Sequence, residues 1–386
     1  MDTDLHPPAL RGRRSRLARP RASQPGTAAH GGDPPVNPAG RRRTHHGPQR
    51  TRCGGFILVA TLWTLAVLAV VAAYVANVVE GDVERAIAAR KALNDEVDRR
   101  STEATLLYLL ATTRMSHRGA VLETPQRFTP PGENPPPGRG DGELTLGGEP
   151  YVGLGRTRFA LQEENGLASV NLPGEPQFAA VLAGAGVRRD DLRWIVPRIR
   201  DYADLDDSLS LNGAERIDYA RVNRPPPANW LLASPVELRR VLGLDSAISD
   251  SQWRRIRPLL TARVAGRYNF NTMRPEVMAS LLGVQESGLT ELLAEREERP
   301  ITNLDQVAVL TGRRPDVDPD FVNVRPSIAL RISLWSEGAR TRETIGLTLT
   351  PQSDTAPWRK EYWYLEGVDD PEAPLRRPAT VLLHQR

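Results

Sequence analysis

The feature that most constrains this chain is an uncharged apolar run near its N-terminus. Residues 53–79 hold no charged side chain. The 24 residues from Phe56 to Val79 would form about 36 Å of α-helix, and the hydrocarbon core of a bilayer is about 30 Å thick. Basic residues lie just before the run and acidic residues just after it. The positive-inside rule therefore predicts a single-pass protein with a cytoplasmic N-terminus and its body on the other side of the membrane.

The helical pattern continues beyond the apolar run. Small and apolar residues recur at i, i+3 and i+4 spacing, which is typical of one face of a helix. They are Ala86, Ala89, Leu93, Val97, Ala104, Leu107 and Ala111. An ordinary signal peptide has a shorter apolar core that ends at a cleavage site. We therefore expect one long helix, which spans the membrane over residues 56–79 and is amphipathic over residues 80–115.

The segment before the run differs from the rest of the chain in charge. Residues 1–54 hold 11 Arg and 3 Asp, a net charge of +8, whereas the remainder holds 40 basic and 44 acidic residues, a net charge of −4. A segment rich in Pro, Gly and Ser with few aliphatic side chains cannot bury a core and is expected to be disordered. It also contains the single cysteine, Cys53, so we expect no disulfide or cysteine-ligated metal in the body.

A basic leader that ends in Gly-Phe before a long helix resembles the N-terminus of type IV pilins and pseudopilins. In that family a prepilin peptidase cuts after the Gly, on the cytoplasmic side, and methylates the new N-terminal residue. The resemblance implies a cut between Gly55 and Phe56, which removes residues 1–55. An anchor that is never cut is the alternative. The leader is longer than the family's usual one, and a wrongly assigned start codon would explain its length.

One position narrows the resemblance. Most family members have Glu at the fifth mature position, where it pairs with the N-terminal amine of a neighbouring subunit, whereas this chain has Ala60. A carboxylate inside the bilayer is costly and needs such a partner. Protein K of the type II secretion system characteristically lacks this Glu, and the chain resembles the protein K family from residue 54 to about residue 365.

The sequence pattern changes twice after the long helix. Residues 116–164 contain a Pro/Gly-rich loop and then an alternation over residues 151–161 that predicts one strand. Residues 165–322 fit short helices, residues 323–370 alternate again as strands do, and residues 371–386 form a tail. The helices are expected at 178–183, 192–203, 233–242, 251–260, 275–282, 289–296 and 303–310. We predict an α+β fold in which a pilin-like antiparallel sheet carries a large inserted α-helical domain, as the resemblance to protein K also implies.

Residues 200–219 are the densest polar cluster of the body. The candidate metal ligands are Asp201, Asp204, Asp206, Asp207, Asn212, Glu215 and Asp218. Ca²⁺ takes about six to eight oxygen ligands, which carboxylates on a flexible loop can provide. The spacing is not that of an EF-hand, and a solvated acidic loop or a helix cap is the alternative. The run also resembles the acidic segment of protein K, with Tyr202 in place of Trp, and this resemblance implies Ca²⁺ in the inserted domain.

Residues 268–272, Tyr-Asn-Phe-Asn-Thr, and the helices expected after them resemble a helix-hairpin-helix unit. Residues 169–172, Ser-Val-Asn-Leu, are a weaker echo of the same pattern. Such units can hold DNA phosphates on the backbone amides of a Gly-rich hairpin. The hairpin over residues 282–288 lacks paired glycines and contains an acid. Because the body is also acidic, we expect a capped strand-to-helix turn and no nucleic-acid partner.

No arrangement typical of an enzyme is present in the body. Its only histidines are His117 and His384, and it has no nucleophile elbow, phosphate loop or zinc-binding helix motif. We therefore expect a structural role, without catalysis.

The function predicted is that of a minor pseudopilin in the bacterial inner membrane, with its body in the periplasm, at the tip of a pseudopilus that serves protein export. The resemblance implies as partners the minor pseudopilins I and J, the major pseudopilin G and the prepilin peptidase. The alternatives are a DNA-uptake minor pilin with a helix-hairpin-helix module and a membrane-tethered enzyme or binding module.

Overall fold

The computed structural model describes residues 54–122, 142–264, 267–284, 286–368 and 373–383. The chain divides into two units, Met1–Tyr74 and Val75–Arg386. Most of the predicted leader, over residues 1–53, and most of the Pro/Gly-rich loop, over residues 123–141, lie outside the described residues.

One uninterrupted helix, α1, runs from Gly54 to Thr112. In its first part the large apolar side chains are exposed, with Phe56 exposed by 80%. By length and composition, α1 alone among the described helices suffices to cross a membrane. In its last turns the apolar side chains, including Leu106 and Leu110, are buried against strands of the sheet. The helix thus joins an exposed apolar segment to a segment that is part of the folded body.

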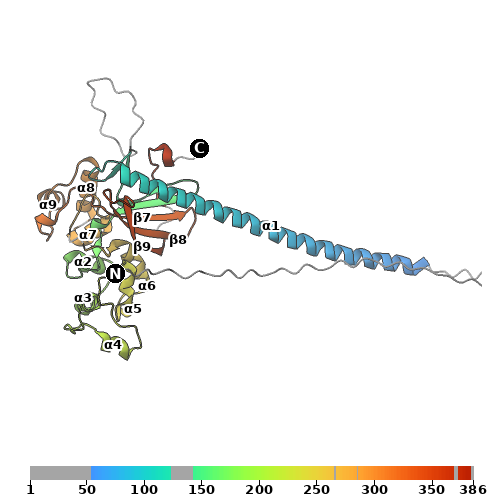
Figure 1. Cartoon of the computed structure of the whole chain (residues 1–386), viewed down its shortest axis with the longest axis horizontal. Coiled ribbons are helices and arrows are strands. Elements are labelled where there is room, and N and C mark those ends of the chain that lie inside the picture. Colours follow the sequence, from blue (N-terminus) through green and yellow to red (C-terminus); the bar gives the residue numbers. More distant parts are fainter. Residues whose placement is uncertain (1–53, 123–141, 265–266, 285, 369–372, 384–386) are drawn as a thin grey trace, which may run out of the picture. The chain divides into compact units, whose positions relative to one another are not determined.

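The body is built on a five-stranded antiparallel sheet in which β7, β8 and β9 lie side by side (Figure 1). The strands are β3 (Gly147–Val152), β4 (Thr157–Glu163), β7 (Ala329–Ser336), β8 (Thr341–Leu349) and β9 (Trp358–Gly367), in the order β3-β4-β7-β8-β9. A separate two-stranded sheet joins β1 (Gly119–Val121) to β2 (Glu143–Thr145). The strands and the last turns of α1 share one apolar core. The predicted α+β class is confirmed.

The single strand expected over residues 151–161 is wrong, because this segment belongs to a hairpin of two strands. Tyr151 in β3 pairs with Phe159 in β4. The turn between them contains Gly155 at φ +56°, where a Cβ atom would lie 1.8 Å from a carboxylate oxygen of Asp98. Only glycine combines that backbone conformation with so close a neighbour, and the alternating pattern of the flanking residues hid the turn.

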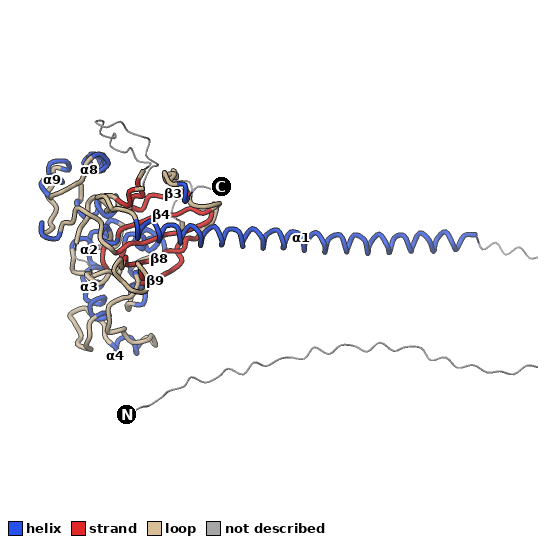
Figure 2. Tube along the Cα trace, turned by 45° about the horizontal axis from the view of Figure 1, so that its top comes forward, coloured by secondary structure: helices blue, strands red, loops and turns tan. Residues whose placement is uncertain are grey.

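A helical insertion separates β4 from β7, which are nevertheless adjacent and paired in the sheet. Figure 2 shows its helices and loops beside the strands. Its helices are α2 (Pro176–Gly184), α3 (Arg189–Ala203), α4 (Arg216–Arg221), α5 (Leu244–Ala247), α6 (Asp250–Ile256), α7 (Pro275–Leu282), α8 (Glu286–Glu298) and α9 (Leu304–Thr311). Its short strands are β5 (Ala168–Ser169) and β6 (Leu260–Thr261). Its 3₁₀ turns are η1 (Glu164–Gly166), η2 (Pro235–Arg240), η3 (Arg257–Leu259) and η4 (Pro319–Phe321). The insertion has an apolar core of its own.

Two of the helices expected in the insertion differ from those observed. Residues 233–242 form only the 3₁₀ turn η2. The helix expected over residues 251–260 ends at Ile256 and is followed by η3 and β6. Pro258 has no amide hydrogen to donate to the preceding turn, which explains why the α-helix stops there.

The first half of the insertion is organised around Asn171. Its Nδ2 donates to the carbonyls of Leu232 (3.0 Å) and Ala262 (2.7 Å), and its Oδ1 accepts from the Leu232 amide (2.9 Å). Nearby, β5 and β6 pair in parallel. The side chain therefore ties the entry of the helices to the chain that returns after them. We call residues 168–262 the first module.

The second half repeats this arrangement around Asn271. Its Nδ2 donates to the carbonyls of Ile301 (3.0 Å) and Val324 (3.1 Å), and its Oδ1 accepts from the Ile301 amide (2.7 Å). Tyr268 and Val322 form a parallel bridge, as β5 and β6 do in the first half. We call residues 268–324 the second module. The two asparagines thus have the same bonding role.

The modules differ in one connection. Leu232 lies 61 residues after Asn171, whereas Ile301 lies 30 residues after Asn271. In the second module, Ile301 lies three residues after the end of α8. In the first module, a long segment that includes α4 lies between the end of α3 and Leu232. We call this segment, residues 204–231, the excursion. It contains most of the polar residues that the sequence proposes as metal ligands.

Buried polar groups join both modules to the sheet. Glu163, the last residue of β4, accepts hydrogen bonds from Asn269 Nδ2 (2.7 Å) and from the Ser327 amide (2.6 Å). In β7, Arg331 is buried and donates to the carbonyl of Leu260 (2.6 Å). Because a buried polar group is costly to leave unpaired, these bonds fix the modules on the strands from which they emerge.

Candidate metal centre

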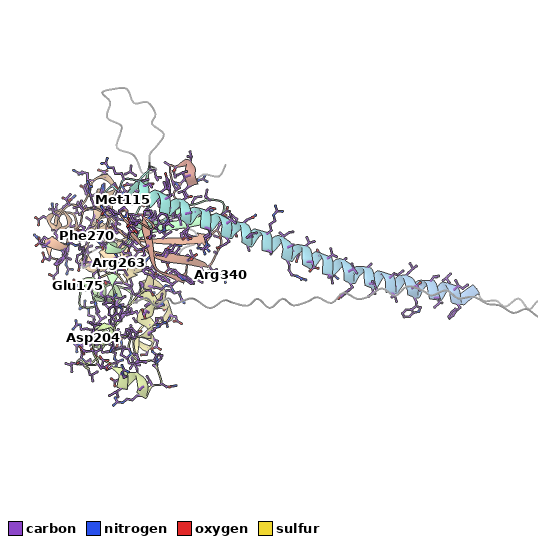
Figure 3. The ribbon with its side chains drawn as sticks, viewed as in Figure 1. Met115, Glu175, Asp204, Arg263, Phe270 and Arg340 are labelled. Carbon is purple, nitrogen blue, oxygen red and sulfur yellow. The ribbon has the colours of Figure 1, made fainter. Side chains whose placement is uncertain are left out.

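Helix α3 brings the first two carboxylates to the start of the excursion. Its apolar side chains Ile195, Ile199 and Tyr202 are buried in the core of the insertion, at the spacing of one helix face. Asp201 is fully buried on the same helix, and Asp204 directly follows it as the C-cap residue. Figure 3 marks Asp204 at the end of α3. The packing of the helix therefore decides where these two acids lie.

A turn then folds over Asp201. One oxygen of this side chain, Oδ2, accepts from the amides of Ser210 and Ala214, both at 3.1 Å. A Cβ atom at Gly213 would lie 1.8 Å from the same oxygen, and Asn212 has a φ of +65°. Gly and Asn are the residues that such a tight turn requires. The turn delivers the next acid, Glu215, to the two that α3 provides.

Asp201, Asp204 and Glu215 form the resulting cluster. Each offers one carboxylate oxygen, and these oxygens all lie within 4.8 Å of one another. Asp201 and Glu215 are buried. Among the described residues no hydrogen-bond partner reaches Asp201 Oδ1, Asp204 Oδ1 or either carboxylate oxygen of Glu215. Buried carboxylate oxygens are normally hydrogen-bonded, so these atoms lack the partner that the fold gives to the other oxygen of Asp201.

The electrostatics of the cluster favour a cation. Burial, followed by the charges of Asp201, Asp204 and Asp207, raises the pKa of Glu215 to about 7. Burial also raises the pKa of Asp204, with further contributions from the charges of Asp206 and Asp201. Acids crowded in this way resist losing their protons unless an opposite charge lies among them. Three converging carboxylates with open oxygens fit a hard divalent ion such as Ca²⁺.

Asp206 and Asp207 have other places in the structure. Asp206 Oδ1 accepts from the Ser208 amide (2.8 Å), and hydrogen bonding by the Ser208 hydroxyl, followed by this amide, lowers the pKa of Asp206. Asp207 Oδ1 accepts from Asn229 Nδ2 (3.0 Å), and its other oxygen lies 3.7 Å from the guanidinium of Arg216. Both side chains therefore shape the loop around the cluster and lie outside the set of converging oxygens.

Asn212 and Asp218 likewise have structural roles. Asn212 is exposed in the turn before Gly213. Asp218 Oδ2 accepts from the Glu215 amide (3.1 Å), and its Oδ1 accepts from Arg221 (2.9 Å). This arrangement holds the start of α4. Of the seven candidate ligands, the structure brings three together and places four around them.

One polar residue of the excursion did not stand out in the sequence. The Asn229 amide donates to the Tyr202 carbonyl (3.1 Å), and Nδ2 donates to the Asp206 carbonyl (2.9 Å). It thereby closes the excursion against the end of α3. Its Oδ1 is buried and has no partner among the described residues. The sequence contains one signal for this role. Asn229 lies two residues after the Pro run over 225–227, and Asn tolerates the left-handed conformation that a turn can require.

The excursion exposes many large apolar side chains. They are Leu205, Leu209, Leu211, Ile217, Val222, Trp230 and Leu231. Only Ala214 and Tyr219 of this segment enter the core of the insertion. Exposed apolar groups gathered in one segment are typical of a surface that contacts another protein. A cation at the cluster would hold this segment in shape.

The helix-hairpin-helix resemblance can be tested at the turn after α2. The amides of residues 185–187 donate to carbonyls within α2. The carbonyls of Ala185 and Gly186 in turn accept from Arg255 Nη2 (2.8 Å) and Gln252 Nε2 (2.7 Å). Phosphate binding by such a hairpin relies on free amides, and these amides are already used. The corresponding turn of the second module includes Gln285, which lies outside the described residues.

The residues predicted to flank the peptidase cut lie at the beginning of α1. The helix starts at Gly54, next to Gly55, and Phe56 is exposed. The cut itself stays a prediction.

Comparison with known proteins assigns one segment of the chain. Residues 159–265 match the family model for the type II secretion system (T2SS), protein K. The segment runs from β4 through the first module and includes the three clustered carboxylates. The resemblance to protein K that the sequence predicts is confirmed over these residues.

A protein from Escherichia coli (strain K12) that is named as a type II secretion system protein K is 39% identical over 85 residues. The alignment covers 21% of this chain and 25% of the relative, so the chain spans a quarter of that protein's length. The crystal structure of the GspK-GspI-GspJ complex from the type 2 secretion system of enterotoxigenic Escherichia coli contains a similar chain, with a TM-score of 0.48 and 16% identity. That similarity covers 74% of this chain and 100% of the other.

Proposed function

We propose that this chain, which carries the protein K segment at residues 159–265, is a minor pseudopilin of the type II secretion system. It acts as a structural subunit at the tip of the periplasmic pseudopilus, where it initiates or caps the fibre used for protein export, and it has no catalytic role. The observation that carries this proposal is the match to the protein K family model. The matched segment is the one that distinguishes this body from a plain helix-and-sheet fold.

The long helix supports the proposal. α1 is long and apolar enough to anchor the chain in a membrane, and its last turns pack in the core of the sheet. We propose a single pass through the inner membrane, with the body in the periplasm, and cleavage between Gly55 and Phe56 by a prepilin peptidase followed by methylation. Ala60 cannot supply the usual charge to a neighbouring subunit, which suits a subunit with an exceptional position in the fibre.

The insertion supports a terminal position. It leaves the sheet after β4 and returns at β7, and it adds a second core to the body. A subunit of that size would obstruct another stacked above it. The family resemblance names the minor pseudopilins I and J and the major pseudopilin G as its partners. The exposed apolar side chains of the excursion provide one surface for such contacts.

We further propose that Asp201, Asp204 and Glu215 hold one Ca²⁺ ion as a structural ligand. Each offers one oxygen within 4.8 Å of the others, and each has at least one carboxylate oxygen without a hydrogen-bond partner among the described residues. Burial and the neighbouring acids raise the pKa of Glu215 to about 7. The ion would neutralise the cluster and fix the excursion on the end of α3. We assign the ion a structural role because the cluster lies where the excursion meets the end of α3.

Secretion in a bacterium that carries this chain tests the proposed function. Deleting the gene should trap type II substrates in the periplasm, and the complete chain supplied in trans should restore their release into the medium. A periplasmic marker enzyme measured in the same fractions controls for leakage. Normal export in the deletion strain would contradict the proposal. Loss of DNA transformation with intact export would instead favour the DNA-uptake alternative.

A further inference from the structure

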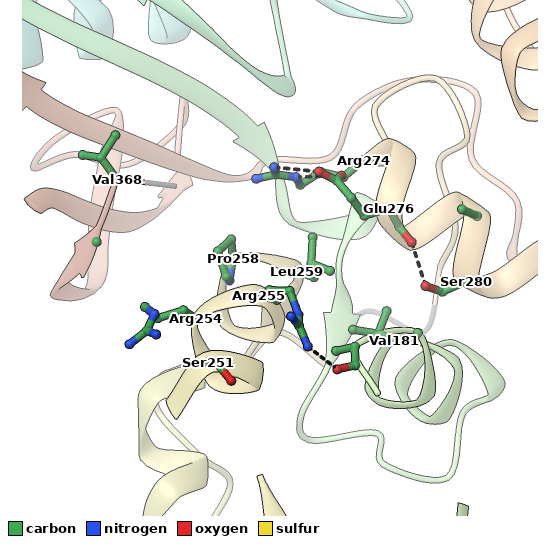
Figure 4. Close-up of a pocket in the computed structure, with 14 residues that line it drawn as sticks. Val181, Ser251, Arg254, Arg255, Pro258, Leu259, Arg274, Glu276, Ser280 and Val368 are labelled. Carbon is green, nitrogen blue, oxygen red and sulfur yellow. Dashed lines mark hydrogen bonds and ion pairs between the residues drawn. The ribbon is translucent and has the colours of Figure 1, made fainter. Parts of the chain in front are cut away.

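A cavity of about 820 Å³ lies between the two modules and the end of β9. Its lining comes from α2, α6, η3, α7 and the residues that end β9. Figure 4 shows Arg254, Arg255 and Arg274 around this cavity, with Pro258 and Leu259 between them. It is separate from the carboxylate cluster, none of whose residues lines it.

The charges that line the cavity are mainly positive. The side chain of Arg254 makes no hydrogen bond or ion pair within the part of the chain that the structure describes. Arg255 donates to the carbonyl of Ala185 (2.8 Å), which is neutral and leaves the guanidinium charge uncompensated. Arg274 lies 3.4 Å from a carboxylate oxygen of Glu276, the one acid of the lining. Three guanidinium groups therefore face a single carboxylate.

The remaining lining favours a ligand with apolar groups. Val181, Pro258, Leu259 and Val368 contribute to the walls, and Pro258 and Leu259 are themselves buried at the base of α6. A volume of about 820 Å³ is in the range of cavities that accept several side chains or a small molecule. Guanidinium groups beside such walls would pair with carboxylates while apolar neighbours of those carboxylates bury their surface.

We propose that this cavity is a docking site for an acidic segment of a partner protein, in which carboxylates lie next to apolar side chains. The chain beyond residue 54 carries a net charge of −4, whereas the cavity is lined by three arginines and one acid. Its local positive charge favours a negatively charged partner. Arg254 and Arg274 bind the carboxylates, and the walls at Val181 and Val368 receive the apolar groups. This site goes beyond the proposed function and does not depend on the metal.

Fluorescence anisotropy with a defined peptide tests this proposal. The probe is Gly-Asp-Leu-Asp-Leu-Gly with an amidated C-terminus and a zwitterionic rhodamine, and its matched control has Asn in place of Asp. The full chain in a neutral detergent should bind the Asp peptide at least about tenfold more tightly than the Asn peptide. Equal binding of both peptides, or no binding by the wild-type chain at about 1 mM, would overturn the proposal.

Variants locate the binding. Arg254→Ala combined with Arg274→Ala should weaken binding of the Asp peptide at least about tenfold. Arg189→Ala combined with Arg193→Ala removes the same two charges from exposed side chains of α3 that do not line the cavity, and it should leave binding unchanged. A retained melting temperature shows that the variants are folded. Equal effects of the two sets of substitutions would show nonspecific attraction and refute the site.

A third variant separates a partner from the chain itself. Asp369, Asp370 and Glu372 follow Val368 in the sequence and lie outside the described residues. Asp369→Asn, Asp370→Asn and Glu372→Gln together should leave the affinity for the Asp peptide unchanged. If the wild-type chain does not bind and only this variant does, the cavity belongs to the chain's own acidic segment and the proposal of a partner is wrong.

Discussion

The two modules of the insertion are each held by the same hydrogen bonds of one asparagine side chain, but only the first module contains the excursion. Asn171 and Asn271 each bridge the entry of the helices to the chain that returns after them. The second module closes with a short connection, so the excursion is not needed to build a module. The candidate metal ligands and a cluster of exposed apolar residues lie at this added segment. The residues that hold a module together are therefore common to both modules, whereas the candidate metal ligands and the exposed apolar residues belong to the segment that only the first module has.

The largest expected effect tests whether the two asparagines are equivalent. Asn271→Ala should lower the free energy of unfolding by about 3 kcal/mol, because Asn271 is buried and the Ile301 amide would lose its partner. Asn171→Ala should cost about 2 kcal/mol, because Asn171 is only half-buried. Urea unfolding of the full chain in neutral detergent measures both. A cost near zero for either variant would show that its module is held by other contacts.

Removal of the cation should affect only the first module. At a free Ca²⁺ concentration about 100-fold above the dissociation constant, the ion should stabilise the chain by about 2.7 kcal/mol relative to chelator. Glu215→Gln should abolish this difference, because it removes one of the three converging carboxylates. The melting temperature is the readout.

Asp218→Asn is the matched control for this substitution. It removes the same charge from a side chain that binds Arg221 and the Glu215 amide, and Asn keeps a side-chain oxygen that can accept from that amide. The response to Ca²⁺ should persist in this variant. Equal melting temperatures of the wild-type chain with Ca²⁺ and with chelator would refute the metal site.

The pH dependence of the cation-free chain sharpens the same point. The pKa of Glu215 is raised to about 7 by burial and by the neighbouring acids, whereas the unfolded chain releases this proton near the ordinary value of 4.5. Between these values the folded state holds more protons, so the stability should fall as the pH rises through this window, by on the order of 1 kcal/mol. Thermal unfolding in chelator at a series of pH values measures the fall.

The response to Ca²⁺ should follow the opposite course. Binding of Ca²⁺ needs the ionised carboxylates. The stabilisation by Ca²⁺ should therefore be greater at pH 8, above the folded pKa of Glu215, than at pH 5, near its unfolded pKa. Glu215→Gln removes the titrating group and should flatten the fall seen in chelator. An unchanged pH profile in that variant would assign the effect to another group.

The smallest expected effect concerns the one large side chain by which the excursion enters the core. Tyr219 is buried, and its hydroxyl oxygen accepts from the Leu242 amide (2.9 Å). Tyr219→Phe should cost about 1 kcal/mol, because that amide loses its partner. Tyr108→Phe alters an exposed ring and should change the stability by less than about 0.5 kcal/mol. Equal effects of the two substitutions would contradict the anchoring role of Tyr219.

Much of the fold could be predicted from the sequence, because local patterns decide it. The absence of charge over residues 53–79 and the helical spacing after it predict α1. The alternation after Pro326 predicts strands, and β7 begins at Ala329. The hairpin of β3 and β4 was missed, because the alternation of apolar and polar residues on both sides of Gly155 hides the turn.

The candidate site was predictable only as a list of acids. Charge density shows that a loop is acidic, but it does not show which side chains converge. Asp201 and Glu215 meet because the amides of Ser210 and Ala214 wrap the turn around Asp201. In the sequence, Asp206 and Asp218 look equivalent to the acids of the cluster. In the structure they lie outside the cluster, and a backbone amide donates to one oxygen of each. Such competition for hydrogen bonds is decided in three dimensions.

N-terminal sequencing of the membrane-extracted chain tests the central claim most directly. From cells with the prepilin peptidase, the mature chain should begin at a methylated Phe56, and from cells without it the chain should keep residues upstream of Gly55. A substitution at Gly55 should block the cut in cells with the peptidase, and the same substitution at Gly54 is its matched control. An identical, uncut N-terminus in the presence and the absence of the peptidase would contradict the assignment of this chain as a pseudopilin.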